Sequence, residues 1–94
     1  MATMMLMHWP EVTKELYETT RKQVNWEGDP PRGGKLHVAR FAPDGFRVVD
    51  LWDSPQDFQT FAETRLIPVT SKLGLTTQPK IEFQESHAIF APNI

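Results

Sequence analysis

The segment RFAPDGFRVVDLWDSPQDFQTF, which runs from Arg40 to Phe61, contains the strongest structural signals in this sequence of 94 residues. Two strand-like runs, 36–41 and 46–52, are separated by Pro43-Asp44-Gly45, and this combination predicts a β-hairpin with a tight turn. Ser54-Pro55 follows at once and is typical of a helix start, because Ser caps free N–H groups and Pro suits the first helical position. A hairpin that leads directly into a helix predicts an α+β fold.

The register of this hairpin decides which side chains share a face. A two-residue turn at Asp44-Gly45 predicts that Ala39 faces Asp50 and that His37 faces Trp52. One face then carries His37, Phe41, Phe46, Val48, Asp50 and Trp52, and the other carries Leu36, Val38, Arg40, Arg47, Val49 and Leu51. Because neither face is purely polar, we expect both faces of the sheet to be at least partly covered.

The segments on either side of the hairpin complete the predicted element order. A strand is expected at 4–9, an amphipathic helix at 11–24, a Gly- and Pro-rich loop at 25–34 and a last strand at 80–90. The helix that starts at Ser54 should be interrupted near Leu66 by Pro68 and should end at Gly74. The order β-α-β-β-α-β is that of the ferredoxin-like fold, with one antiparallel sheet of four strands and both helices on one face. We expect residues 1–94 to form a single domain.

The amino-acid composition argues against several classes of binding partner. The formal charge is −2 and no basic stripe occurs, which argues against nucleic acid. No apolar stretch approaches the ~20 residues that span a bilayer, so no membrane partner is expected. The sequence has no cysteine, which excludes thiolate catalysis and is consistent with a cytoplasmic location. A chain this short has a thin core, and a second copy packed on the open sheet face would add burial.

The stretch Val49-Asp50-Leu51-Trp52-Asp53-Ser54, followed by the helix from Pro55 to Phe61, resembles the dimeric α/β-barrel superfamily, in the branch of the antibiotic-biosynthesis monooxygenases. The likeness lies in an acidic residue two before a strand-ending Trp, a Ser cap and then an amphipathic helix. The resemblance implies a homodimer that packs sheet to sheet, with a small hydrophobic or aromatic ligand between sheet and helices. Members include cofactor-independent oxygenases of polyketide aromatics, haem-degrading enzymes, isomerases and proteins without a known activity.

Within this superfamily the resemblance does not support haem degradation, because that branch uses a histidine on the second helix and none occurs there. The oxygenase branch uses Asn, Trp and Tyr side chains around its substrate. Asn25, Trp26, Trp52 and Tyr17 are the residues of these types that could be assembled here. No cofactor is expected.

Three residues are candidates for catalysis. His37 shares a predicted face with Asp50, and a histidine oriented by a carboxylate can act as a general base. His8, at the end of the first strand, is the second histidine candidate. The alternative is that these are sheet histidines with satisfied hydrogen bonds. Together with His87 they do not have the spacing of a metal site, and none is predicted.

Substrate-binding candidates are the large side chains near this face. We expect Trp52, Trp26, Asn25, Phe61 and Arg65 to contact a ligand, since Trp stacks on flat rings and Arg binds anions. The alternative reading is that Trp52 belongs to the core and that Arg65 is a solvated surface residue.

Three functions remain open from the sequence. The first is an oxygenase of small aromatic molecules, and the second is a non-enzymatic protein that binds such a molecule. The third is a structural homodimer whose pocket is filled by its own Phe58, Phe61 and Trp52. A shared fold does not decide among them.

Overall fold

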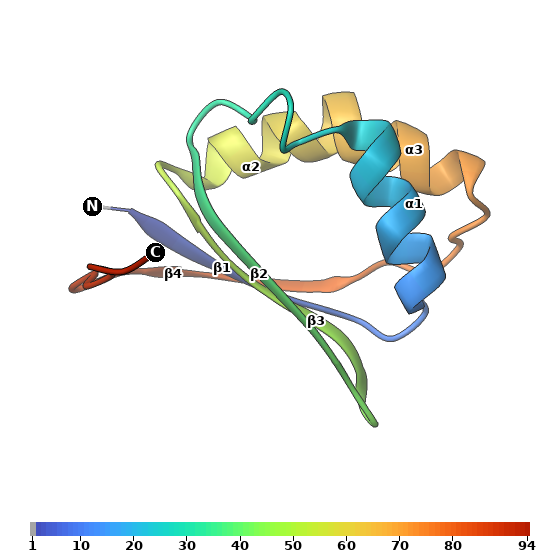
Figure 1. Ribbon diagram of the computed structural model, residues 1–94, viewed down its shortest axis with the longest axis horizontal. Coiled ribbons are helices and arrows are strands. Elements are labelled where there is room, and N and C mark those ends of the chain that lie inside the picture. Colours follow the sequence, from blue (N-terminus) through green and yellow to red (C-terminus); the bar gives the residue numbers. More distant parts are fainter. Residues whose placement is uncertain (1) are drawn as a thin grey trace.

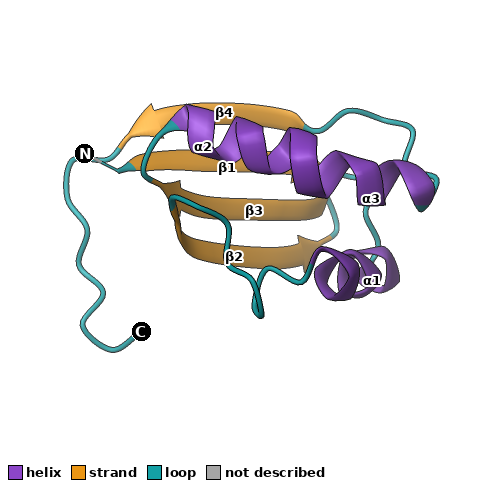
Figure 2. Cartoon of the chain, turned by 90° about the horizontal axis from the view of Figure 1, so that it is seen from above, coloured by secondary structure: helices purple, strands orange, loops and turns teal. Residues whose placement is uncertain are grey.

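A computed structural model describes residues 2–94, and its elements follow the expected order. They are β1 (Thr3–Trp9), α1 (Lys14–Val24), β2 (Gly34–Ala42), β3 (Gly45–Trp52), α2 (Pro55–Phe61), η1 (Ala62–Leu66), α3 (Ile67–Lys72) and β4 (Lys80–Glu85). The strands form one antiparallel sheet in the order β2-β3-β1-β4. All helices lie over one face of this twisted sheet, as Figures 1 and 2 show from two directions. The α+β, ferredoxin-like fold expected from the sequence is confirmed.

The β2–β3 hairpin turns one residue earlier than predicted, which shifts the cross-strand pairing by two residues. Pro43 and Asp44 form the turn, because Ala42 pairs with Gly45, and Gly45 has a positive φ of 107°. The predicted pairing of His37 with Trp52 is therefore wrong, and His37 pairs with Asp50 instead. Because the shift is an even number of residues, every side chain keeps its predicted face.

The first helix starts later than expected, at Lys14 rather than Glu11. Thr13 caps it, since its Oγ1 accepts a hydrogen bond from the N–H of Leu16 at 3.1 Å. Glu11 instead reaches across to the loop before β4, where its carboxylate accepts bonds from the backbone N–H and the hydroxyl of both Thr76 and Thr77. These bonds, led by the backbone N–H of Thr77, hold the pKa of Glu11 below its usual 4.5.

The second helical segment is interrupted as predicted. Ser54 caps α2 by accepting the N–H of Asp57 at 3.2 Å. Pro68 has no N–H to donate to the preceding turn, and the turn just before it, η1, is a π-helical turn. The chain then continues as α3, and Gly74 follows it with a φ of 85°.

The last strand is shorter than the predicted 80–90, because β4 ends at Glu85. Among residues 2–94 it pairs with β1 alone, and the pairing of Thr3 with Glu85 reaches the beginning of that strand. Ser86 closes the ladder by donating both its N–H and its hydroxyl to the carbonyl of Ala2. Residues 87–94 leave the sheet as an irregular segment, which we call the C-terminal tail.

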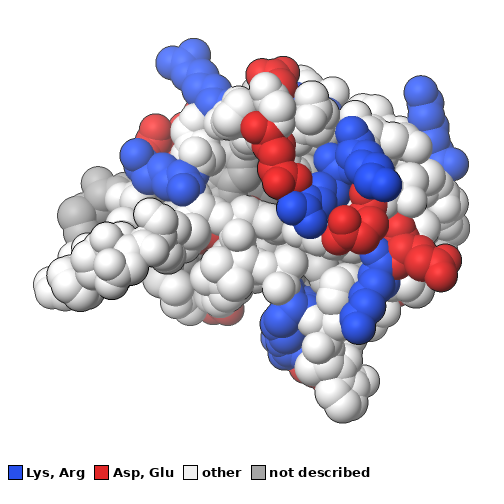
Figure 3. Space-filling model, viewed as in Figure 1, with Lys and Arg blue, Asp and Glu red and all other residues white. Residues whose placement is uncertain are grey.

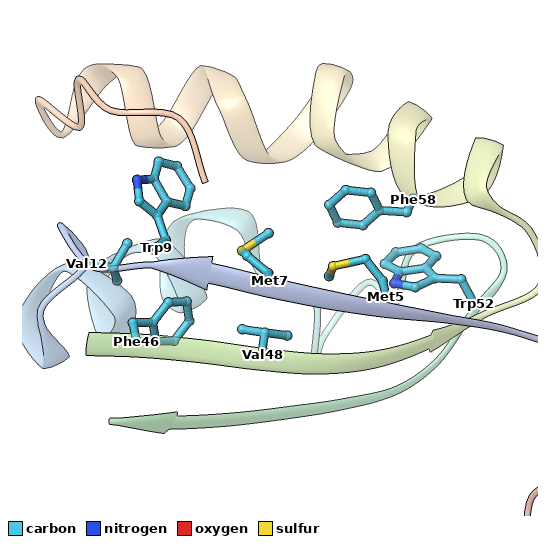
Figure 4. Packing of buried hydrophobic residues seen from close by; sticks show 8 residues of the cluster. All are labelled: Met5, Met7, Trp9, Val12, Phe46, Val48, Trp52 and Phe58. Carbon is cyan, nitrogen blue, oxygen red and sulfur yellow. The ribbon is translucent and has the colours of Figure 1, made fainter. Parts of the chain in front are cut away.

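The core lies between the sheet and the helices. Figure 4 shows its eight buried apolar side chains pointing from β1, β3, the β1–α1 turn and α2 into this layer: Met5, Met7, Trp9, Val12, Phe46, Val48, Trp52 and Phe58. The opposite side of the sheet, here called the back face, also carries apolar side chains: Met4, Leu6, Leu36, Val38, Val49 and Leu51. Nothing within the described residues forms a layer over the back face (Figure 1).

Charged side chains are mixed in sign over the face shown in Figure 3, where blue and red groups alternate above α1 and the loop that follows it. Several are paired, such as Arg40 and Arg47 with Asp44 and Arg21 with Glu27. No helix among residues 2–94 combines the length and apolar character required to cross a bilayer.

Candidate active-site cavity

A cavity of about 230 Å³ lies between the sheet and the helical layer. Most of its walls are apolar side chains of the core, with Phe61, Leu66 and Leu75 contributed by the helical side. The polar groups in the lining are few: Tyr17, Thr20, Lys35, His37, Asp50 and Thr70. An apolar cavity with a small number of convergent polar groups is typical of a small-molecule site. Its existence argues against the structural homodimer with a filled pocket.

Three of these polar groups, Tyr17, His37 and Asp50, form one hydrogen-bonded chain with Trp52. The indole N–H of Trp52 donates to Asp50 Oδ2 at 3.0 Å, and His37 Nδ1 lies 2.7 Å from Asp50 Oδ1. On the other side of the ring, His37 Nε2 lies 2.8 Å from the hydroxyl of Tyr17. A carboxylate only accepts hydrogen bonds, so Nδ1 of His37 carries the proton. In the neutral imidazole Nε2 is then the acceptor, and the Tyr17 hydroxyl donates to it.

The sheet register and the first helix bring this chain together. His37 and Asp50 are cross-strand partners on β2 and β3 and point to the same face. Trp52 follows two residues after Asp50 on that face, and Tyr17 comes down from α1. Asp50 is 5 % exposed, whereas the His37 side chain is about one third exposed at the sheet edge. The chain therefore runs from the buried core to an accessible imidazole.

Aromatic rings surround the accessible end of the chain. The rings of Tyr17 and His37 are nearly parallel at 10°, with centroids 6.0 Å apart, and Trp26 lies 5.2 Å from His37 and 5.8 Å from Tyr17. Burial is the main cause that raises the pKa of Tyr17 above its usual 10.0, opposed by the positive charge of Arg21. The phenol therefore stays protonated at neutral pH and can serve as a hydrogen-bond donor.

The loop from Asn25 to Gly33 forms one rim of the cavity, to which it contributes Trp26, Pro30 and Pro31. Arg65 of the π turn holds this loop in place. Its Nη2 donates to the carbonyl of Val24 at 2.9 Å, and the guanidinium lies over the Phe61 ring at 5.4 Å and near Asp29 at 3.8 Å.

The structure brings five of the eight residues expected from the sequence to the cavity: His37, Asp50, Trp52, Trp26 and Phe61. The other three lie outside its lining. His8 is on the back face, where its Nε2 lies 2.7 Å from the carbonyl of Asp44. Asn25 ends α1 in the left-handed conformation and accepts the N–H of Gly28, and Arg65 makes the loop contacts described above.

Tyr17 is not among the eight site residues expected from the sequence, although the family resemblance named it as a residue of a suitable type. Its place on the apolar face of α1 indicated packing against the sheet and gave no sign of its partner. The signal that could have found it is the hydroxyl itself, since a tyrosine on a sheet-facing helix stripe needs a hydrogen-bond partner from the sheet.

Comparison with known proteins identifies the fold. No family model and no curated protein matches the sequence. The structure is similar to the protein of unknown function NE2512 from Nitrosomonas europaea, at 15% identity over 97% of this chain and 94% of that one, with a TM-score of 0.69. The chain therefore shares with this protein the fold of one four-stranded antiparallel sheet with helices on one face.

Two similar structures are described as oxygenases. The cofactor-independent oxygenase SnoaB from Streptomyces nogalater is 11% identical over 94% of both chains, with a TM-score of 0.63. A monooxygenase from Streptomyces coelicolor, in complex with the ligand nanaomycin D, is 20% identical over 98% of this chain and 93% of that chain, with a TM-score of 0.50. The resemblance inferred from the sequence is thus confirmed for the fold.

Proposed function

We propose that this protein is a cofactor-independent monooxygenase of a small aromatic molecule, with His37 as general base, Asp50 as the carboxylate that orients it and Tyr17 as a hydrogen-bond donor. The observation that carries the proposal is the chain Trp52–Asp50–His37–Tyr17 at the wall of an apolar cavity. The similarity to two oxygenases supports it as analogy of fold.

The geometry suits removal of a proton from a bound ligand. Asp50 fixes the tautomer of His37, so that Nε2 presents a lone pair toward the cavity. A hydroxyl or an activated C–H of the ligand replaces the Tyr17 hydroxyl at Nε2 and transfers its proton there. Asp50 stabilises the imidazolium that forms, and Tyr17 donates to the oxygen of the ligand anion.

Such an anion reacts with oxygen without a cofactor when it is electron-rich. In an anthrone-like compound, loss of a proton from the ring CH₂ gives a carbanion that O₂ oxidises to a hydroperoxide. Loss of water then leaves a C=O group, so that one CH₂ and one O₂ yield one C=O and one H₂O. The apolar walls keep bulk water from the anion.

The volume of the cavity limits the size of the ligand that it can hold. An apolar cavity of about 150 Å³ holds benzene. The cavity of about 230 Å³ in this protein therefore favours a molecule of one or two fused rings, or part of a larger one that extends past the loop rim. Trp26 and Phe61 offer ring faces on which such a ligand can stack.

Oxygen uptake tests the proposal. Naphthols, hydroxylated phenyl ketones and anthrone are supplied in air-saturated buffer, and the rate with protein is compared with the rate without it. We expect uptake with at least one compound, and a loss of about 10²–10⁴-fold in kcat for His37→Ala. His87→Ala is the matched control, because His87 lies in the tail and outside the cavity lining. Absence of uptake across the panel, or equal rates in both variants, would contradict the proposal.

The second candidate is a protein that binds a small aromatic molecule without reaction, favoured by the apolar lining. Thermal shift measurements with the same compounds separate the two cases. A ligand that raises the melting temperature and is recovered unchanged after aerobic incubation supports binding alone.

We also propose that two copies pack through their back faces into a homodimer. The support is the apolar surface of Met4, Leu6, Leu36, Val38, Val49 and Leu51 on a sheet face that the helices leave open. A sheet with one apolar face exposed is at risk of association, and a symmetric pair covers both copies at once. Sedimentation equilibrium of the full chain at micromolar concentration tests this, and a monomer would contradict it.

A further inference from the structure

Lys35 is a charged residue of the cavity lining that the proposed chemistry does not use. Among the described residues that line the cavity, the other side chains that can carry a charge near neutral pH are Asp50 and His37. The carboxylate of Asp50 is already bonded to His37 and to the indole of Trp52. Lys35 is therefore the group in the lining that can bind a negative charge on a ligand.

A β-bulge at the beginning of β2 fixes the place of Lys35. In the β2–β3 ladder Gly34 pairs with Trp52, and the next pairing is that of Leu36 with Leu51. Lys35 is the extra residue between these two pairings. A bulge bends its strand and redirects the side chains beside it, and bulges are over-represented next to active sites. Figure 1 shows the first part of β2 curving toward the helical layer. Lys35 thus lies at the mouth of the cavity.

The backbone around the bulge is held by hydrogen bonds on both sides. The N–H of Gly34 donates to the carbonyl of Pro31 at 3.1 Å, and the N–H of Asp53 donates to the carbonyl of Gly33 at 2.8 Å. A Cβ at Gly34 would lie 3.1 Å from Cγ of Pro31 and 3.4 Å from the Trp52 ring. A larger residue would narrow this gap, so the glycine keeps the mouth open beside the lysine.

The present partner of Lys35 can be exchanged at little cost. Its Nζ lies 3.1 Å from Oδ1 of Asp53, and the two side chains are 53% and 55% exposed. An ion pair between exposed side chains contributes little to stability, because water competes for both groups. Asp53 itself lies outside the cavity lining. A ligand whose ring enters the cavity can therefore bring its own anionic group to Nζ in place of the Asp53 carboxylate.

We propose that the ligand of this cavity is an aromatic carboxylate, which binds Nζ of Lys35 at the mouth while its ring lies against the apolar walls. The inference rests on the proposed function for the cavity as the ligand site, and it adds the class of substrate. Lys35 and His37 are two residues apart on β2, which is about 6.6 Å along a regular strand. That separation is comparable with the length of one substituted ring. A hydroxyl at the far end of the ring can therefore reach Nε2 of His37.

Isothermal titration calorimetry with ligands that differ in charge alone tests this inference. 4-Hydroxybenzoate and 6-hydroxy-2-naphthoate are each compared with the corresponding neutral amide. In the wild-type protein at low salt we expect each acid to bind at least about fivefold more tightly than its amide. Salt at about 0.5 M should reduce this preference, because it screens the exposed ammonium group.

Variants of Lys35 identify the source of the preference. In Lys35→Met the preference for the acid should disappear, while the affinity for the amide changes by less than about twofold. Lys35→Arg should retain the preference, because a guanidinium also binds a carboxylate. Lys22→Met is the matched control, since Lys22 is an exposed lysine of α1 outside the cavity lining, and it should behave as the wild type.

Asp53→Asn gives a result that a merely structural role of Lys35 would not produce. The replacement removes the carboxylate that competes for Nζ, so the acids should bind about twofold or more tightly than to the wild type, and the amides should not. The double variant Lys35→Met, Asp53→Asn should show no preference for the acid. Both side chains are more than half exposed, so these variants should keep their fold, which the melting temperature checks.

The outcomes separate this inference from the proposed function. A preference for the acid that requires Lys35 and increases in Asp53→Asn supports the inference. Equal affinities for acid and amide in the wild type, or a preference that Lys35→Met retains, overturn it. Absence of binding by all four compounds also overturns it. Oxygen uptake with anthrone, which carries no carboxylate, decides the proposed function separately in each of these cases.

Discussion

Replacement of Asp50 by Asn should reduce the stability of the protein only slightly but remove the ability of His37 to act as a general base. The Asn side chain keeps an oxygen that can accept the Trp52 N–H, but its other atom is an NH₂ group that only donates. To accept that bond, Nδ1 of His37 must lose its proton, and the proton then resides on Nε2. In Asp50→Asn the imidazole thus presents a donor toward Tyr17 and the cavity, and it no longer has the lone pair that a general base uses.

The magnitude follows from the contacts of Asp50. Two hydrogen bonds to a carboxylate are replaced by two neutral ones, a loss of about 1 kcal/mol each. The His37 side chain is one third exposed, so solvent weakens the contribution of its hydrogen bond to stability. We therefore expect Asp50→Asn to lower the free energy of unfolding by about 1–2 kcal/mol. For a domain of this size that lowers the melting temperature by about 4–16 °C. The rate with any substrate that the wild-type protein oxidises should fall by about 10²–10⁴-fold.

Nitrogen-15 NMR of the ring nitrogens measures the tautomer without a known substrate. The chain has only three histidines, so the signals of His37 can be assigned by comparison with His37→Ala. Asp50→Ala serves as the stability control: it leaves the buried Trp52 N–H without an acceptor, which adds about 1–3 kcal/mol to the cost. If His37 in Asp50→Asn retained the Nδ1–H tautomer, or if Asp50→Ala were no less stable than Asp50→Asn, the hydrogen-bond assignment would be refuted.

Three further outcomes are expected. The folded protein holds the pKa of Glu11 below 4.5, so the stabilisation by its ionised carboxylate is complete above that pH and is lost as the pH falls through the lowered pKa. Between pH 6 and 3 the melting temperature should therefore decline less in Glu11→Gln than in the wild type. Parallel curves for the two proteins would contradict this. Gly33→Ala should be destabilised by more than Gly74→Ala, although both have a positive φ, because a Cβ at Gly33 would clash with the Asp57 side chain whereas Gly74 faces open space; denaturant unfolding of both variants decides it. Phe58→Ala, at a side chain 4% exposed, should lose about 3–5 kcal/mol in the same assay, and a loss below about 1 kcal/mol would mean that Phe58 is not packed as described.

Most of the fold could be predicted from the sequence, because its signals are local. The capping Ser54, the break near Pro68 and the hairpin between two strand-like runs each depend on neighbours in the sequence. The errors arose where a distant segment decides the outcome. Glu11 has the character of a first-turn helix residue, yet its carboxylate binds Thr76 and Thr77, which are 65 and 66 residues away. The last strand ends at Glu85, opposite Thr3, where its neighbour β1 begins.

The candidate site was harder to predict, for a related reason. The alternation of β2 and β3 places His37 and Asp50 on one face, and that part is visible in the sequence. Their direct pairing depended on a turn at Pro43-Asp44 rather than one residue later. The contact with Tyr17 depends on how α1 sits over the sheet edge, and such tertiary placement leaves no periodic signal in a single sequence.

The π turn before Pro68 determines which side of α3 faces the cavity. In an unbroken α-helix Phe58 and Thr70 would point about 120° apart, because each residue turns the helix by about 100°. The extra residue of the π turn removes about 100° of that difference, so both side chains face the sheet, where each is about 95% buried. A regular helix one residue shorter in this turn would keep the two side chains about 20° apart, the same offset that the π turn provides. The π turn therefore accommodates one additional residue between Phe58 and Thr70 without rotating α3 away from the cavity.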